Sequence, residues 1–202
     1  MHVPPALHAA APAAKISPDA RVTHSSGSHT VTSRHVVFSH GQEGGPWGRK
    51  ITVLADTARA EGYEPESVDY RGIDSPQARV ARLMEFCKEL QGELVLVGSS
   101  LGGFVSVAAA SHLHARGVFL MAPAIHAAGL PELRRGALDC PVMVVHGWRD
   151  QVVPCEDSVR FARSHGASLH LVDDDHRLHG ALGMIRYLFE YFLISLDLPA
   201  AG

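Results

Sequence analysis

The sequence predicts an α/β protein with a mostly parallel, doubly wound sheet and helices on both faces. Two observations predict this class. Short apolar runs, typical of strands buried on both sides, alternate along the chain with amphipathic helical segments. Polar residues and glycines follow several of these runs directly, as in the loops at the carboxyl ends of parallel strands. The 202 residues, 46% hydrophobic and 19% charged, fit one globular domain.

The first part of the chain is expected to supply an arm, two strands and two helices. Residues 1–33 are rich in Ala, Pro, Ser, Thr and His and have little periodicity, so we expect an N-terminal arm or an edge strand there, with the domain itself at residues 34–202. Ser75 followed by Pro76 is a typical start of a helix. The expected elements are a strand at 35–39, a helix at 47–61, a weaker strand at 67–70 and a helix from 75 to about 91.

A turn with the pattern G-x-S-x-G comes next, at residues 98–102. It follows the apolar strand segment 93–97 and precedes a helix of small residues at 103–110. In such a turn the chain reverses so sharply that side chains two residues before and after the serine would collide, which favours glycine at both places. Only Ser100 fits, because a turn centred on Ser99 would place valine and leucine there. The turn should lift the Ser100 hydroxyl above the sheet.

The second half of the chain repeats the alternation of strands and helices. We expect strands at 117–121, 141–145 and 168–172, and helices at 154–165 and 178–198. Two further polar side chains follow these strands. Asp150 comes after the strand at 141–145, and His176 is the first basic residue after the strand at 168–172.

Ser100, Asp150 and His176 form a chemically meaningful set. A serine hydroxyl is a poor nucleophile at neutral pH unless a base lies within hydrogen-bond reach, and the base needs an acid that holds its tautomer. Three alternatives stay open. Ser100 could be only a residue of the turn. Asp150 could cap the helix that follows it, and His179, three residues after His176, could be the base instead.

In the order of its motifs, the chain resembles the α/β-hydrolase family. The resemblance covers residues 34–198 and implies hydrolysis through an acyl-enzyme. Ser100 would attack the substrate, His176 would shuttle the proton and Asp150 would orient the imidazole. The matching motifs are His40-Gly41, Asp69-Tyr70-Arg71-Gly72, the turn at 98–102, His146-Gly147 with Asp150 and Val153-Pro154, and Asp175-His176.

The same resemblance implies an oxyanion hole and a possible substrate pocket. The backbone N–H of Leu101 would supply one donor of the hole, and that of Gln42, after His40-Gly41, the other. His40, Trp47 and Trp148 are candidate pocket residues. Each has a plainer interpretation, because His40 could be a structural loop residue and either tryptophan could belong to the core.

The spacing of the motifs resembles that of the minimal, lidless members of the family, such as small esterases and dienelactone hydrolases. Only 19 residues separate Met121 from the strand near Pro141, enough for one short helix but not for a cap domain. The family's first two strands are missing or reduced to residues 21–33. We therefore expect an open site that takes a short-chain ester or thioester, with peptide bonds less favoured.

The charge, the cysteines and the terminal segments of the chain argue against a nucleic-acid-binding, secreted or membrane protein. A formal net charge of −3 gives no electrostatic reason to bind nucleic acid or an anionic membrane. The three cysteines (Cys87, Cys140 and Cys155) lack CxxC spacing, as expected for reduced thiols in the cytoplasm. Met1 to Ala20 does not resemble a signal peptide, and the charges in the last helix exclude a membrane span. We expect a soluble, cytoplasmic protein.

Cofactors and partners are predicted from the same residues. A serine mechanism needs no cofactor, and His170, His176 and His179 lack a recognised metal-ligand spacing, so we expect no metal. The expected partner is a small-molecule ester or thioester, and the oligomeric state stays open between monomer and homodimer. The alternative hypothesis is a non-catalytic interaction or regulatory protein on the same scaffold.

Overall fold

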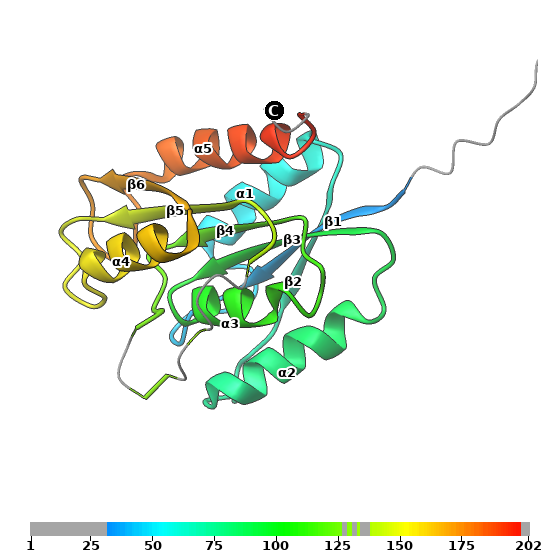
Figure 1. The fold of residues 1–202 in the computed structure, drawn as a ribbon, viewed down its shortest axis with the longest axis horizontal. Coiled ribbons are helices and arrows are strands. Elements are labelled where there is room, and N and C mark those ends of the chain that lie inside the picture. Colours follow the sequence, from blue (N-terminus) through cyan, green and yellow to red (C-terminus); the bar gives the residue numbers. More distant parts are fainter. Residues whose placement is uncertain (1–31, 127–128, 131–132, 134–137, 199–202) are drawn as a thin grey trace, which may run out of the picture. The chain divides into compact units, whose positions relative to one another are not determined.

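The computed structural model describes residues 32–126, 129–130, 133 and 138–198 (Figure 1). Within these residues six strands form one sheet in the order β2-β1-β3-β4-β5-β6, and every neighbouring pair is parallel. The strands are β1 (Arg34–Ser39), β2 (Glu64–Val68), β3 (Glu93–Ser99), β4 (Gly117–Met121), β5 (Val142–Gly147) and β6 (Ser168–Val172). The helices are α1 (Arg49–Ala60), α2 (Pro76–Cys87), α3 (Leu101–Ala110), α4 (Cys155–His165) and α5 (Leu182–Ser195). The predicted fold class is confirmed.

Helices cover both faces of the sheet. α1 and α5 pack on one face, and α2, α3 and α4 pack on the other (Figure 1). A hydrophobic core lies on each face of the sheet, and alternate residues of each central strand belong to opposite cores. Val36 and Phe38 pack into the core under α1 and α5, and Val37 packs into the core on the other face. Burial of both faces explains why the central strands appear in the sequence as continuous apolar runs.

Two elements begin three or more residues away from the predicted start. β2 starts at Glu64, not at residue 67, because parallel pairing with β1 begins at His35 opposite Glu64. The strand lies at the edge of the sheet, where a polar sequence and a proline are tolerated. The last helix starts at Leu182, not at 178. The Asp174 carboxylate accepts a hydrogen bond from the N–H of Ala181, which holds the preceding residues in a loop, and the helix begins at the next residue.

Two expectations concern segments that lie largely outside the described residues. The arm or edge strand at residues 1–33 overlaps them only at Thr32 and Ser33, which are not in a strand. The short helix expected between β4 and β5 falls in a segment of which residues 127–128, 131–132 and 134–137 are not described; the described remainder of that segment contains no helix. The domain therefore has the minimal form, without a cap in its described part.

The order of the strands explains where a site can form. From β1 the chain passes through α1 to β2 on one side, and through α2 to β3 on the other side. The loops after β1 and β3 therefore diverge at a topological switch point, where α/β sheets bind ligands. Ser39 and Ser99 end these two strands.

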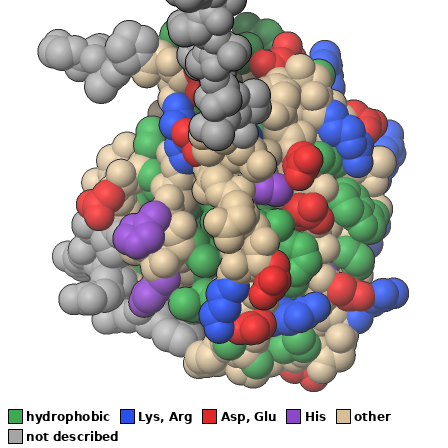
Figure 2. Space-filling model, turned by 90° about the vertical axis from the view of Figure 1, so that its right-hand side faces the viewer, with side chains coloured by type: hydrophobic (Ala, Val, Ile, Leu, Met, Phe, Trp, Pro, Cys, Tyr) green, Lys and Arg blue, Asp and Glu red, His purple; other side chains and the backbone are tan. Residues whose placement is uncertain are grey.

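The surface carries charges of both signs. Figure 2 shows acidic and basic side chains interspersed on one face, without a broad area of a single charge. This mixture agrees with the small net charge of −3. None of the helices in the described residues is both long and apolar enough to cross a membrane.

Candidate active site

Ser100 lies at the apex of the turn between β3 and α3, in a strained backbone conformation. Its φ of 55° and ψ of −123° are values that residues with side chains rarely adopt. Hydrogen bonds hold it there. The N–H of Ser100 donates to the carbonyl of Met121 at 3.0 Å, and the carbonyl of Ser100 accepts from Gly103 at 2.8 Å and from Ala124 at 3.0 Å.

The turn requires glycine on both sides of Ser100, as the sequence predicts. A Cβ atom on Gly98 would overlap the carbonyl oxygen of Gly102, and a Cβ atom on Gly102 would overlap the carbonyl oxygen of Ser39. Each obstacle is backbone, which cannot move aside as a side chain can. Glycine therefore lets the end of β3, the start of α3 and the end of β1 meet at one point.

The structure brings Ser100, His176 and Asp150 into one hydrogen-bonded chain. His176 Nε2 lies 3.0 Å from Ser100 Oγ, and its Nδ1 lies 2.6 Å from Asp150 Oδ2. A carboxylate can only accept, so Nδ1 carries the proton and Nε2 is free to accept from the serine hydroxyl. His179, the alternative base, is exposed on the surface.

The carboxylate of Asp150 is fully buried and saturated with donors. Oδ1 accepts the N–H groups of Val152 and Val153 at 2.8 Å each, and Oδ2 also accepts from His146 Nε2 at 3.0 Å. Burial raises the pKa of Asp150, but the hydrogen bonds from Val153, His176 and Val152 outweigh it and hold the pKa below its usual value. The group is therefore an anion at neutral pH.

Asp150 does not cap the helix that follows. α4 begins at Cys155 with Pro154 at its N-cap, and no side chain caps it. The carboxylate instead holds the turn at Val152 and Val153, which fixes the loop that carries it.

His146, which is predicted only as part of a motif, also donates a hydrogen bond to the Asp150 carboxylate. It is completely buried, and its Nε2 lies near two pure acceptors, Asp150 Oδ2 and the carbonyl of Val153 at 3.1 Å. Nε2 therefore donates, and Nδ1 accepts from the hydroxyl of Ser158 at 2.7 Å. The available signal was a histidine that ends an otherwise apolar strand.

The loop after β1 passes directly beside Ser100. A Cβ atom on Gly41 would lie 3.1 Å from Ser100 Cβ and 3.6 Å from Ser100 Oγ. The next residue is Gln42, whose side chain donates to Asp74 at 3.2 Å. On the other side, Leu101 begins α3, and the N–H groups of a first helical turn have no partner within the helix. Of the two predicted oxyanion-hole residues, Leu101 therefore follows Ser100 directly, and Gln42 follows Gly41, which packs against Ser100.

His40 is the first residue of this loop, and its side chain is turned into the protein. The residue is buried, its Nε2 accepts the N–H of Tyr70 at 3.0 Å, and its Nδ1 donates to the carbonyl of Gly41 at 2.7 Å. Burial lowers the pKa of His40, which keeps the ring neutral. Both nitrogens are used within the protein, so the plainer interpretation of His40 applies.

The two tryptophans lie on the surface. Trp47 is 49% exposed and Trp148 is 61% exposed, so neither belongs to the core. Trp148 donates its indole N–H to Asp173 at 3.0 Å. A contact of either ring with a substrate stays a prediction.

Two further ionisable residues near the turn were not predicted. Lys50, on α1, donates from Nζ to Ser99 Oγ at 3.0 Å, and burial lowers its pKa to about 8 against the opposing charges of Asp150, Asp174 and Asp175. Arg79, on α2, is buried next to the loop after β1. Arg79 occupies the same stripe of its helix as the buried residues Leu83 and Cys87, and that position was the available signal.

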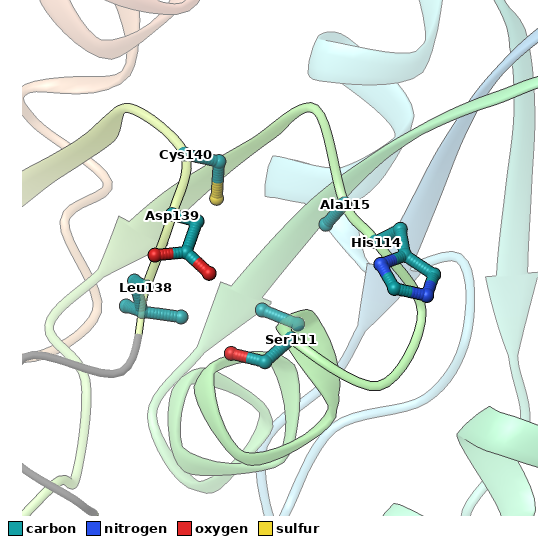
Figure 3. Close-up of a pocket in the computed structure, with 7 residues that line it drawn as sticks. Ser111, His114, Ala115, Leu138, Asp139 and Cys140 are labelled. Atoms are coloured by element: carbon teal, nitrogen blue, oxygen red, sulfur yellow. The ribbon is translucent and has the colours of Figure 1, made fainter.

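A cavity of about 180 Å³ lies away from these residues, near the amino ends of β4 and β5 (Figure 3). Because Ser100 follows the carboxyl end of β3, the cavity belongs to the opposite end of the sheet. The residues that line the cavity are Ala110, Ser111, His114, Ala115, Leu138, Asp139 and Cys140.

Comparisons with known proteins agree with this fold. Residues 36–172 match the Alpha/beta hydrolase family. A candidate hydrolase of the alpha/beta superfamily from Xanthomonas campestris pv. campestris has a TM-score of 0.74 and 32% identity, over 80% of this chain and 99% of that one. An alpha-beta serine hydrolase homologue from Coxiella burnetii has a TM-score of 0.69 and 22% identity, over 80% and 85%. Est1E from Butyrivibrio proteoclasticus has a TM-score of 0.68 and 16% identity, over 82% and 88%. No curated protein matches the chain.

Proposed function

Because the chain belongs to the alpha/beta hydrolase family, we propose that it is a serine hydrolase that cleaves a carboxylic ester or thioester through an acyl-enzyme on Ser100. One observation carries this proposal: His176 bridges Ser100 Oγ and the Asp150 carboxylate at 3.0 and 2.6 Å. This is the geometry that a hydroxyl needs in order to become a nucleophile at neutral pH.

In the first half of the reaction Ser100 Oγ attacks the carbonyl carbon of the substrate, and His176 Nε2 takes the hydroxyl proton. Asp150 stabilises the imidazolium that forms, and its fixed carboxylate keeps the ring in one orientation. The tetrahedral intermediate develops a negative oxygen, which the N–H groups of Leu101 and Gln42 stabilise. His176 then gives its proton to the leaving alcohol or thiol, and the acyl group stays on Ser100.

In the second half, water takes the place of the leaving group. His176 accepts a proton from the water as the water oxygen attacks the acyl carbon, and a second oxyanion forms in the same hole. Collapse of that intermediate returns the proton to Ser100 Oγ and releases the carboxylic acid. No step requires a metal or an organic cofactor.

The substrate class follows from what surrounds the site. The described part of the connection between β4 and β5 contains no helix or strand that could cover Ser100. Ser100 itself is partly accessible in the loop region at the carboxyl ends of the strands. An uncapped site favours a small acyl group and a leaving group that can extend into solvent.

A fluorophosphonate probe tests the proposal, because it reacts covalently with an activated serine. We expect the folded wild-type protein to be labelled and Ser100→Ala to be unlabelled. Ser99→Ala is the matched control, since it removes the neighbouring hydroxyl and should still be labelled. Absence of labelling of folded wild-type protein, or equal labelling of Ser100→Ala, would favour a non-catalytic role on this scaffold.

A further inference from the structure

Arg79 is a buried cation next to the loop that borders Ser100. It is 2% exposed, on the first turn of α2. Nε donates to the carbonyl of Ile73 at 2.7 Å, and Nη1 points to the carbonyls of His40 at 3.5 Å and Gly41 at 3.3 Å. Its hydrogen-bond partners in the described chain are thus backbone carbonyls and not carboxylates. The Asp74 carboxylate stabilises the charge of Arg79 from a distance, but the donors of the guanidinium are directed at backbone carbonyls, so the hydrogen bonds indicate a role other than charge pairing.

The carbonyl of Gly41 is held by two donors. It accepts from Arg79 Nη1 and, at 2.7 Å, from His40 Nδ1. The tautomer of His40 is fixed, because its Nε2 accepts the N–H of Tyr70 at 3.0 Å and Nδ1 must therefore carry the proton. The ring of Tyr70 also lies 5.4 Å from the guanidinium carbon of Arg79, which restricts the arginine from a second direction.

Holding a carbonyl fixes the N–H of the same peptide group. The peptide between Gly41 and Gln42 is trans, so its C=O and N–H point in opposite directions. The Gln42 N–H therefore points away from Arg79 and His40. Gly41 itself packs against Ser100, where even an added Cβ atom would lie within 3.1 Å of the serine. Reversal of the peptide between Gly41 and Gln42 would exchange its N–H and its carbonyl oxygen in the loop that borders Ser100.

We propose that Arg79 is a positioning residue for the oxyanion hole. With His40 it holds the carbonyl of Gly41, and this keeps the N–H of Gln42 aimed at the oxygen of the tetrahedral intermediate on Ser100. The inference rests on the function proposed above and adds a device that sets one donor of the hole. Arg79 touches neither the substrate nor Ser100.

Steady-state hydrolysis of p-nitrophenyl acetate by Arg79→Met tests this role. Methionine keeps much of the volume of the side chain but removes the donors. We expect kcat to fall about 10- to 100-fold and KM to change less than threefold, because an oxyanion donor acts mainly in the transition state. Acylation and deacylation both pass through an oxyanion, so kcat should fall whichever step limits the rate.

The pH dependence of kcat/KM separates positioning from general damage. Arg79→Met leaves Asp150 and His176 in place, so the profile should keep the wild-type midpoint while its height falls. Arg79→Lys retains a cation that can still reach a carbonyl, and should recover part of kcat. Arg82→Met removes an exposed arginine from the same helix and should match wild type in both kcat and KM.

Two outcomes would overturn the proposal: folded Arg79→Met with kcat within twofold of wild type, or a loss that appears only in KM. If circular dichroism shows that Arg79→Met does not fold, Arg79→Lys decides the question. We then expect kcat about 3- to 10-fold below wild type with KM unchanged, and an unchanged kcat rejects the role. Wild-type protein that neither hydrolyses esters nor reacts with fluorophosphonate would instead reject the proposed function itself.

Discussion

At the residue scale, the proposed base is the histidine whose two ring nitrogens contact the Ser100 hydroxyl and the Asp150 carboxylate. His176 bridges Ser100 and Asp150, whereas His179 is exposed three residues later. We expect His176→Ala to lower kcat/KM for p-nitrophenyl acetate by roughly 10⁴-fold or more, since the hydroxyl loses its base. His179→Ala is the matched control and should stay within about twofold of wild type. The opposite ranking of the two variants would mean that the loop rearranges in solution.

Because Lys50 carries a largely buried amino group, we expect the free energy of unfolding to depend on pH. Burial lowers its pKa to about 8 in the folded state, whereas the unfolded chain has the ordinary value of 10.5. Below pH 8 both states are protonated, and the folded state carries the full cost of a buried charge. As the pH rises from 8 to 10.5 the folded state loses its proton first, so this cost disappears.

The variant Lys50→Met isolates this effect. At pH 7 it should exceed wild type in the free energy of unfolding by roughly 1–3 kcal/mol, because it removes the buried charge. The difference should shrink steadily between pH 8 and 10.5, as measured by urea unfolding at each pH. Lys88→Met, at an exposed lysine, serves as the control and should track wild type. A difference that is constant with pH would show that packing, not charge, separates the two proteins.

At the element scale, the apolar runs predict the central strands, but they do not predict the buried polar residues that contact the site. β3 and β4 are apolar over most of their length because both faces are buried, so their positions could be predicted. β2 lies at the edge and has a polar sequence, so only pairing with β1 defines its start at Glu64. Arg79 and His146 stand within helix and strand patterns. The carbonyls of His40 and Gly41 that Arg79 contacts are far away in the sequence. The partners of His146 are close in the sequence, on the following loop and helix, but the strand pattern does not show that they turn back toward it.

Helix α3 contains a buried hydroxyl, that of Ser106, whose removal should stabilise the protein. Ser106 is completely buried, and within the described residues its hydroxyl has no hydrogen-bond partner. Ser106→Ala removes an unsatisfied polar group and introduces a better helix former, so we expect the free energy of unfolding to rise by about 1 kcal/mol.

Ser158 on α4 is the matched control for this prediction, because it is equally buried but bonded to His146 at 2.7 Å. Ser158→Ala leaves the Nδ1 atom of His146 without a donor and should lower the free energy of unfolding by about 1–2 kcal/mol. Thermal or urea unfolding of both variants provides the comparison. Equal destabilisation by the two substitutions would mean that the Ser106 hydroxyl has a partner after all.

At the scale of the whole molecule, the parallel topology explains why a site could be predicted from residues far apart in the sequence. Ser100, Asp150 and His176 each follow a strand, and the carboxyl ends of parallel strands meet at one edge of the sheet. The sequence order therefore predicts their proximity. It does not predict that Asp150 accepts from two histidines, nor that His40 is turned inward, because these details depend on the packing of loops against each other.

The absence of a cap in the described part of the domain predicts how the rate depends on acyl length. A pocket that buries each methylene of the substrate gains about 0.8 kcal/mol per methylene, or about fourfold in kcat/KM. In an open site the additional methylenes stay in water and gain little.

Across p-nitrophenyl acetate, butyrate, hexanoate and octanoate, we expect kcat/KM to rise by less than twofold per methylene, with Ser100→Ala as the background. The rate should also saturate smoothly as butyrate approaches its solubility limit, because the described residues form no cap that could open at an interface. A fourfold rise per methylene, or a jump in rate once droplets form, would reveal an apolar wall over Ser100 and contradict the open site.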